Sequence, residues 1–286
     1  MSISKEIERL QQAKKDIGDA IVRKGGSVSG TIDTYAKSVM ALGDVSFRTA
    51  IDIVNKSDAK NVNLTMISPR NETSLDNLFS GNSNLTNINV SNWDTSNITS
   101  LKGVFSSMPN LESVDFAEWD VSNVTTFYAL FDDSRKVNTF DVRKWNTSSA
   151  TNMEWMFCRT NATHIDVSNF DTSNVLNINT MFAYFDICEE LNINGWDLTR
   201  CTSINNTFNN SNFKVIRCDG LKFPDIDMSK IGLHYSTALA VDSIVGLLNA
   251  LPQSDKGYSF QIGSDNIAKL TDEQKAIATD KGWTLI

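Results

Sequence analysis

Thirteen letters at residues 93–105, WDTSNITSLKGVF, return at residues 119–131 as WDVSNVTTFYALF, and looser copies follow at 145–157, 170–182 and 196–208. The phenylalanines that end these blocks, together with an earlier equivalent, are Phe79, Phe105, Phe131, Phe157, Phe182 and Phe208. They are spaced 26, 26, 26, 25 and 26 residues apart. A fixed period of this size is typical of a solenoid, in which each unit buries against its neighbour a face that it cannot bury alone.

Each block follows a short segment in which apolar and polar residues alternate, as in LTNINVSNW at 85–93 and LESVDFAEW at 111–119. Alternation with a period of two predicts a β-strand. Within the blocks, apolar residues recur at helical spacing, as Ile98, Leu101 and Phe105 do. We therefore expect each unit to be a strand, a corner and a short α-helix or 3₁₀ turn. The predicted fold class is an α/β repeat solenoid with a leucine-rich-repeat-like parallel β ladder.

The corner between strand and block is rich in short polar side chains. Asp94, Ser96 and Asn97 carry oxygens that can bond nearby backbone N–H groups, which would shape the turn and cap the following helix. An aromatic residue precedes each corner, at Trp93, Trp119, Trp145, Phe170 and Trp196. We expect these rings to stack on one another and close the core. The alternative is a row of aromatic residues that binds a ligand.

The repeat pattern sets the predicted domain boundaries. Residues 61–67 and 213–221 show the same alternation, so the predicted solenoid covers residues 45–236. A capping unit is predicted over residues 237–286, with a helix that stops at Pro252 and a possible last rung at 258–262. Thr271 and Gln274 have the spacing of a capping box at the start of a final helix.

Residues 1–44 differ from the repeats and predict an N-terminal helical anchor. Its apolar residues at near-heptad spacing are Ile3, Ile7, Leu10, Ile17 and Ile21, with Lys14 interrupting the series. Two interpretations remain open, a short coiled coil between copies of the chain and a helix that docks on another surface. Both make this segment the part that attaches the protein to something, either in a homo-oligomer or to another protein.

Composition excludes several classes of function. A net charge of −8 argues against a nucleic-acid partner, and no run of apolar residues is long enough for membrane insertion. The first fifteen residues lack the apolar core of a secretory signal, so we expect synthesis in a cytoplasm. Four scattered cysteines and two histidines form no zinc spacing and no catalytic pair, so we expect no metal, no cofactor and no catalytic residue.

Alternation also predicts a column of outward side chains on the strands. Its candidate binding residues are Asn89, Asp115, Asp141, Asp166, Asn192 and Arg217. Parallel strands in register would hold these side chains about 4.8 Å apart. Neighbouring carboxylates would repel, so a cation, a basic ligand or hydration must relieve them. Calcium usually takes its oxygen ligands from a loop that wraps it, which leaves a solvated face or a surface for a glycan or protein partner.

The units WDTSNITSLKGVF and WDVSNVTTFYALF resemble the repeats of the BspA-type leucine-rich-repeat surface proteins of bacteria. The resemblance covers residues 60–221 and implies binding, with no catalytic residues. Residues 266–285 resemble the closing cap of many such proteins, and the opening of the chain is similar to helical modules of phage tail and baseplate proteins.

Because this resemblance comes without the expected secretory signal, it favours a bacteriophage virion structural protein (fibre, tail or head appendage) over a cell-surface adhesin. We expect the N-terminal helices to bind other virion proteins and the repeats to bind a host-surface glycan or protein. A bacterial adhesin exported by a non-Sec route is the alternative. An enzyme is the third hypothesis, disfavoured because the sequence has no recognisable catalytic constellation.

Overall fold

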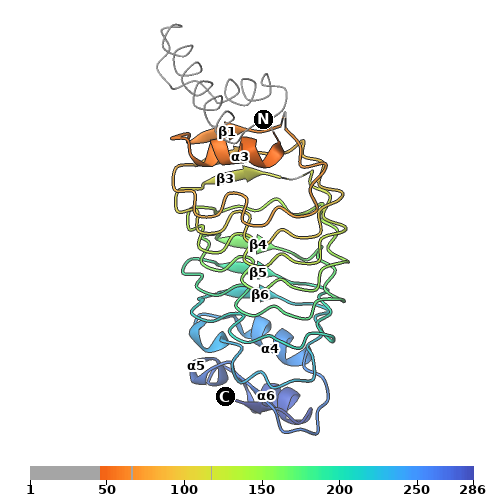
Figure 1. The fold of residues 1–286 in the computed structure, drawn as a ribbon. Helices are drawn as coiled ribbons and strands as arrows, with labels where there is room; N and C mark the ends of the chain where they lie inside the picture. Colours follow the sequence, from red (N-terminus) through yellow and green to blue (C-terminus); the bar gives the residue numbers. More distant parts are fainter. Residues whose placement is uncertain (1–45, 66, 117) are drawn as a thin grey trace, which may run out of the picture.

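The computed structural model describes residues 46–65, 67–116 and 118–286, which form a stack of rungs that ends in a small group of helices (Figure 1). The predicted anchor, with Ile3, Ile7, Leu10, Ile17 and Ile21, lies outside the described residues. Helix α3 (Phe47–Asn55) opens the stack, and η1 (Leu233–Tyr235), α4 (Val241–Asn249), α5 (Ser264–Ile267) and α6 (Asp272–Thr279) close it. None of the helices described has the length and apolar character needed to cross a bilayer.

Six short strands line one side of the stack in two parallel sheets. The strands are β1 (Asn61–Asn63), β2 (Asn87–Asn89), β3 (Ser113–Asp115), β4 (His164–Asp166), β5 (Glu190–Asn192) and β6 (Val215–Arg217). Neighbouring strands pair in register, so that Val62, Ile88 and Val114 lie side by side, all three facing the core. The predicted parallel β ladder is confirmed for these strands, including the degenerate first one.

The strand predicted within residues 137–145 is wrong. The described chain has no strand between β3 and β4, and the sheet divides there into a β1–β2–β3 part and a β4–β5–β6 part. Phe140 stands at the position where other rungs carry the smaller Val114 or Ile165. Its ring lies 4.8 Å from Phe131 and 4.9 Å from Phe157, between centroids. The rung with this larger side chain is the one whose strand is missing among the described residues.

The helix predicted in each block is wrong. Each block is instead a run of tight turns closed by i to i+3 hydrogen bonds, such as that from the N–H of Leu78 to the carbonyl of Leu75 at 3.1 Å. Neighbouring blocks pair in a second parallel ladder, in which the N–H of Leu75 donates to Ser100 at 3.0 Å and that of Phe79 to Val104 at 3.0 Å. The pairs of this ladder join, in order, Ser74, Ser100, Thr126, Asn152, Asn177 and Ser203. Kinks produce the helix-like spacing, because each block has a left-handed residue two positions before its phenylalanine, such as Asn77 (φ 55°).

The phenylalanine spine predicted from the repeat is confirmed. Successive rings from Phe79 to Phe208 stack with centroid separations between 5.4 and 6.2 Å and interplanar angles of at most 13°. All six are buried in one continuous core. Because each ring covers its neighbours, removing one would expose two others, which ties the stability of each rung to the next.

The polar corners hold the rungs together. The Asp94 carboxylate accepts from the N–H and the hydroxyl of Ser96, so the expected local turn is confirmed, although no helix follows for it to cap. Thr95 is buried, and its hydroxyl donates to the carbonyl of Asp120 in the next rung. Asn123 Nδ2 donates to the carbonyl of Ser96 in the preceding rung. Corners therefore recur because each one supplies hydrogen bonds to the rungs on both sides.

The aromatic residues at the corners are buried, as the core-closing interpretation predicts, so they are not available as a ligand-binding row. Trp93 and Trp119 stack at 5.9 Å with an angle of 6° between their planes. The indole N–H of Trp119 donates to the Val90 carbonyl, and Trp196 donates to Val167 in the same way. The buried indole N–H of Trp145, in the rung that lacks a strand, has no acceptor among the described residues.

Both ends of the stack are covered. Helix α3, which the sequence analysis did not predict, begins at the N-cap Ser46 and places Arg48 and Asn55 over the first block, where they donate to the carbonyls of Ser74 and Leu78. At the other end the predicted capping box of Thr271 and Gln274 is confirmed at the start of α6. Strands β7 (Ser259–Phe260) and β8 (Thr284–Leu285) pair in parallel there.

Candidate binding face

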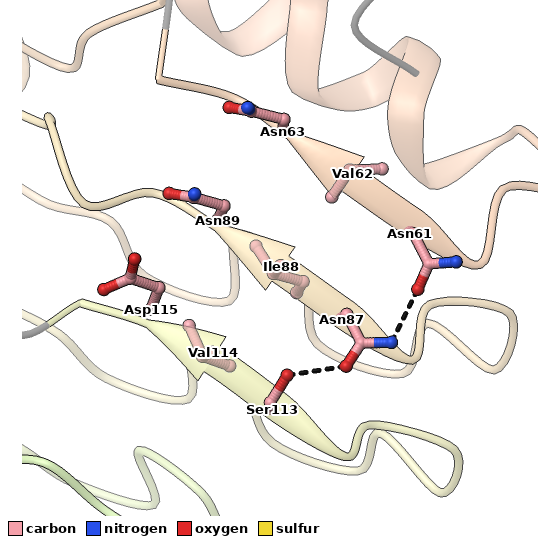
Figure 2. Close-up of a pocket in the computed structure, with 9 residues that line it drawn as sticks. All are labelled: Asn61, Val62, Asn63, Asn87, Ile88, Asn89, Ser113, Val114 and Asp115. Atoms are coloured by element: carbon pink, nitrogen blue, oxygen red, sulfur yellow. Dashed lines mark hydrogen bonds between the residues drawn. The ribbon is translucent and has the colours of Figure 1, made fainter. Parts of the chain in front are cut away.

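The outward side chains of β1, β2 and β3 border a shallow hollow of about 290 Å³ (Figure 2). Its lining is Asn61, Val62, Asn63, Asn87, Ile88, Asn89, Ser113, Val114 and Asp115. Because the strands are in register, the polar members form two parallel columns, one at the first residue of each strand and one at the last. We call this surface the strand face.

The first column is a chain of side-chain hydrogen bonds. Asn87 Nδ2 donates to Asn61 Oδ1, and the Ser113 hydroxyl donates to Asn87 Oδ1 at 2.6 Å (Figure 2). Thr86 adds its hydroxyl to Asn61 Oδ1 at 3.1 Å. These bonds fix the orientation of the amides, so the column presents a preorganised row of uncharged polar groups.

The second column contains the predicted site residues Asn89 and Asp115, in register with Asn63. The Oδ1 of Asn89 accepts from the N–H and hydroxyl of Ser91 at 3.1 and 2.9 Å. Thr65 makes the same pair of bonds to Asn63. The side chains of this column thus shape the turns that end their strands, and Asn63 and Asn89 keep their Nδ2 groups turned outward in the hollow (Figure 2).

The predicted site residues Asp166, Asn192 and Arg217 lie in register at the ends of β4, β5 and β6. Asp166 accepts from the N–H and hydroxyl of Ser168 at 3.1 and 2.7 Å. Burial would raise the pKa of this carboxyl, but the bonds from Ser168 outweigh it and lower the pKa. Arg217 forms an ion pair with Glu190 on the neighbouring strand. This second part of the column therefore carries charges, which hydrogen bonds stabilise at Asp166 and an ion pair stabilises at Arg217.

The prediction that Asp141 continues the column is wrong, because no strand holds it. Its carboxylate instead forms a two-pronged ion pair with Arg143, at 2.8 and 2.9 Å, which lowers its pKa. The expected run of three repelling carboxylates therefore does not form. An ion pair with Arg143 stabilises the charge of Asp141, and hydrogen bonds from Ser168 stabilise that of Asp166. Each partner lies in the same rung as its carboxylate.

The cysteines have environments unsuited to nucleophilic catalysis. All four are free and buried, and burial raises the pKa of Cys188 to about 12 and that of Cys218 to about 11. A thiol with such a pKa is not a thiolate at neutral pH. In the described part of the chain, no three His, Cys, Asp or Glu side chains gather where they would hold a metal ion.

The sequence of the stack also matches a known family. A family model described as Mycoplasma protein of unknown function, DUF285, matches residues 73–190 and 140–216, which together cover half of the chain. The chain belongs to this family. The DUF285 match spans the rungs from the first full block to β6, and so includes most of the strand face. No curated protein and no solved structure matches the chain.

Sequence reasoning missed part of the candidate site of this DUF285 chain. Asn61, Asn87 and Ser113 were not singled out, although they lie two residues before Asn63, Asn89 and Asp115 and therefore face the same way. The alternation was sufficient to find them. The location of the hollow could not be predicted, because the alternation is the same in β1–β3 and in the segment after β3 that forms no strand.

Proposed function

We propose that this protein is a non-enzymatic structural component of a bacteriophage virion, in which a leucine-rich-repeat-type solenoid binds a host-surface ligand through the strand face. Under this proposal residues 1–44 attach the chain to other virion proteins. The single observation that supports ligand binding is the hollow on β1, β2 and β3, lined by amide and hydroxyl groups that their neighbours hold in place.

The chemistry of the hollow favours a hydroxyl-rich ligand, which is a glycan chain. Amides and hydroxyls both donate and accept, so they match sugar hydroxyls without requiring a charge on the ligand. Their orientations are already fixed, which lowers the entropy cost of binding. The two columns repeat from rung to rung, which suits a ligand that itself has repeating units.

A bacterial surface adhesin of the BspA-type repeat class is the alternative, and it would use the strand face in the same way. The two differ in location and in what residues 1–44 bind. Mass spectrometry of purified phage particles distinguishes them, because a virion component copurifies with capsid and tail proteins and an adhesin does not.

Glycan binding is tested with an array of bacterial surface polysaccharides. We expect the Asn87→Ala, Ser113→Ala double variant to lose at least about tenfold in affinity for any glycan that the wild-type chain binds, because it removes two of the three side chains of the first column. Asn192→Ala is the matched control, since it removes the corresponding kind of side chain from the second sheet.

Equal binding by the double variant and the wild type would remove the strand face from consideration. Failure of the wild-type chain to bind any polysaccharide on the array would contradict the glycan proposal. Thermal unfolding of both variants separates a binding defect from a loss of fold.

A further inference from the structure

The blocks form a second surface, on the outer side of the second ladder, which the proposed function does not use. We call it the block face and define it as residues 73–81, 99–107, 125–133, 151–159, 176–184 and 202–210. Its ladder continues without interruption through six rungs, from Ser74 to Ser203, whereas the strand ladder breaks after β3. The block face is therefore the longer continuous surface of the two.

Aromatic and basic side chains gather at the centre of the block face. The Arg159 guanidinium lies between two rings, 4.5 Å from the centre of Tyr184 and 5.4 Å from that of Trp155. Tyr128 lies one rung before Trp155, and the ammonium of Lys102, from the rung before that, lies over its ring at 5.3 Å. The aromatic residues are half-buried, and the outermost rungs carry small polar residues such as Asn77 and Asn206. Aromatic and arginine residues at the centre with a polar rim are the usual anatomy of a protein interface.

The backbone shows that these large side chains are held at a cost. Trp155, Arg159 and Tyr184 all have positive φ, at 61°, 57° and 62°, in the left-handed region that disfavours side chains with a Cβ. The same positions in the other rungs also have positive φ, with residues that range from Gly81 and Gly103 to Ala129 and Thr180, so all the rungs share these kinks. At the kinks, Trp155, Arg159 and Tyr184 are only half-buried and leave part of their side chains exposed on the block face.

The charges on the block face suggest which partner covers it. Three positions before the phenylalanine, successive rungs carry Lys102, Tyr128 and Glu154, so a positive and a negative charge lie one rung to either side of a tyrosine. Within the described residues, neither Lys102 nor Glu154 has an ion-pair partner. Glu154 is held in place by hydrogen bonds from Trp155 and Asn177 at 3.1 and 2.9 Å.

This arrangement is complementary to itself. A two-fold axis that lies over Tyr128 in the plane of the interface, perpendicular to the stack, would place rung two of one copy opposite rung four of the other. Lys102 would then face Glu154 of the second copy, and the same pair would form again across the axis. An interface between identical copies requires this reciprocity, in which residue i meets j and j meets i.

We propose that the block face joins two copies of this chain across such an axis at Tyr128. The surface is large enough for this role. With the axis at rung three, rungs one to five of the two copies overlap. Five rungs at about 4.8 Å and nine residues spanning at most about 30 Å give at most roughly 700 Å² of surface. One side of a standard protein interface buries about 800 Å². The other charged side chains at the centre form ion pairs within the chain, as Arg159 does with Asp132 at 3.4 Å. Burying them in an interface therefore leaves no charge without a partner.

A charge exchange in the full-length chain tests the interface. Sedimentation velocity and mass photometry over a concentration series give the dimer dissociation constant. We expect Lys102→Glu alone to raise this constant by about 30-fold, because the reversal turns two symmetric attractions into repulsions. Glu154→Lys alone should do the same. The double variant Lys102→Glu, Glu154→Lys should restore dimerisation to within about threefold, since it exchanges the signs and keeps the pairs.

Trp155→Ala provides a second test that does not involve charge, and we expect a loss of about 100-fold in dimer affinity, because an interfacial tryptophan is removed twice. Lys214→Glu, beside the second sheet, is the control charge reversal and should leave the dimer intact. A monomeric wild-type chain overturns the proposal. A dimer that both single reversals leave unchanged also overturns it, because association would then involve another part of the chain.

Discussion

The two long surfaces of this molecule are built from the same repeat but differ in continuity. The strand side of the molecule is divided into two sheets. The side-chain oxygens of its second column accept hydrogen bonds within local turns, as Asn89 does from Ser91. The block face is one ladder from Ser74 to Ser203, crossed by left-handed residues in each rung. The phenylalanine spine lies between them and is shared by both.

The difference shows that the repeat period sets the spacing of the rungs, while individual residues determine whether the strand side of a rung forms a β-strand. An interruption on the strand face does not interrupt the block face. Rung four loses its strand at Phe140 and Asp141, yet the ladder passes through Thr126, Asn152 and Asn177 unchanged. The block ladder and the phenylalanine spine therefore hold successive rungs together, whereas the strand side tolerates the loss of a strand.

We expect the largest difference in stability between the two sides when phenylalanines of the core are replaced by alanine. Phe131→Ala should lower the free energy of unfolding by about 4 kcal/mol, because its ring is fully buried between Phe105 and Phe157. Phe140→Ala should cost only about 2 kcal/mol, since that ring is partly exposed where no strand forms. Urea unfolding followed by circular dichroism measures both. Equal costs would contradict the view that rung four is loosely held on its strand side.

A smaller difference is expected from two serines. The buried Ser134 hydroxyl donates to the Phe105 carbonyl and accepts the N–H of Met108. Ser134→Ala should therefore cost about 2 kcal/mol, because two buried backbone groups lose a partner. Ser168→Ala, at the end of β4, should cost about 0.5 kcal/mol, since Asp166 is exposed and water replaces the hydroxyl. A Ser168 variant as unstable as the Ser134 variant would show that the strand-side turns matter more than we infer.

The third comparison uses two tryptophans on the strand side of the core. Trp119→Phe removes the hydrogen bond to Val90, whereas Trp145→Phe removes an indole N–H that has no acceptor. The volume change is the same, so Trp119→Phe should be more destabilising by about 1 kcal/mol in urea unfolding. If the Trp145 variant were the less stable of the two, its indole N–H would have a partner in solution.

The smallest effect is expected in the pH dependence of unfolding. Hydrogen bonds from Lys222 and then Thr199 lower the pKa of Asp197 to about 2, so the folded state favours its charged form. This contribution is present above the ordinary carboxyl pKa of about 4 and is lost as the pH falls from there towards 2. Asp197→Asn should therefore flatten the loss of stability over that range, measured by thermal unfolding in a pH series.

The block-face carboxyl Asp132 gives the opposite sign and serves as the control. Burial raises its pKa, in spite of the thiol of Cys158 and the charge of Arg159, so protonation on acidification favours the folded state. Asp132→Asn removes that gain, and its stability should fall more steeply with decreasing pH than that of the wild type. Identical pH profiles for the two variants would contradict both assignments.

The spine and the in-register strands were predictable because units of constant length must place equivalent residues above one another. The spacing of the block phenylalanines carries that information directly. The turns of the blocks were not distinguishable from a helix by apolar spacing, because left-handed kinks at Trp155 and Thr180 imitate a helical period. The strand missing at Asp141 was not predictable either, because a two-residue alternation does not describe how Phe140 packs against two rings.

The hydrogen bonds between rungs run in both directions along the stack. Within a block, N–H groups such as that of Leu75 donate to the following rung, whereas the N–H at the start of each block, as in Thr99, donates to the preceding rung. An uncovered end would leave some of these backbone groups without partners, and such an edge can pair with another chain. Arg48 and Asn55 donate to two carbonyls of the first block and so cover part of this edge. Helix α3 therefore protects the first rung from edge-to-edge pairing.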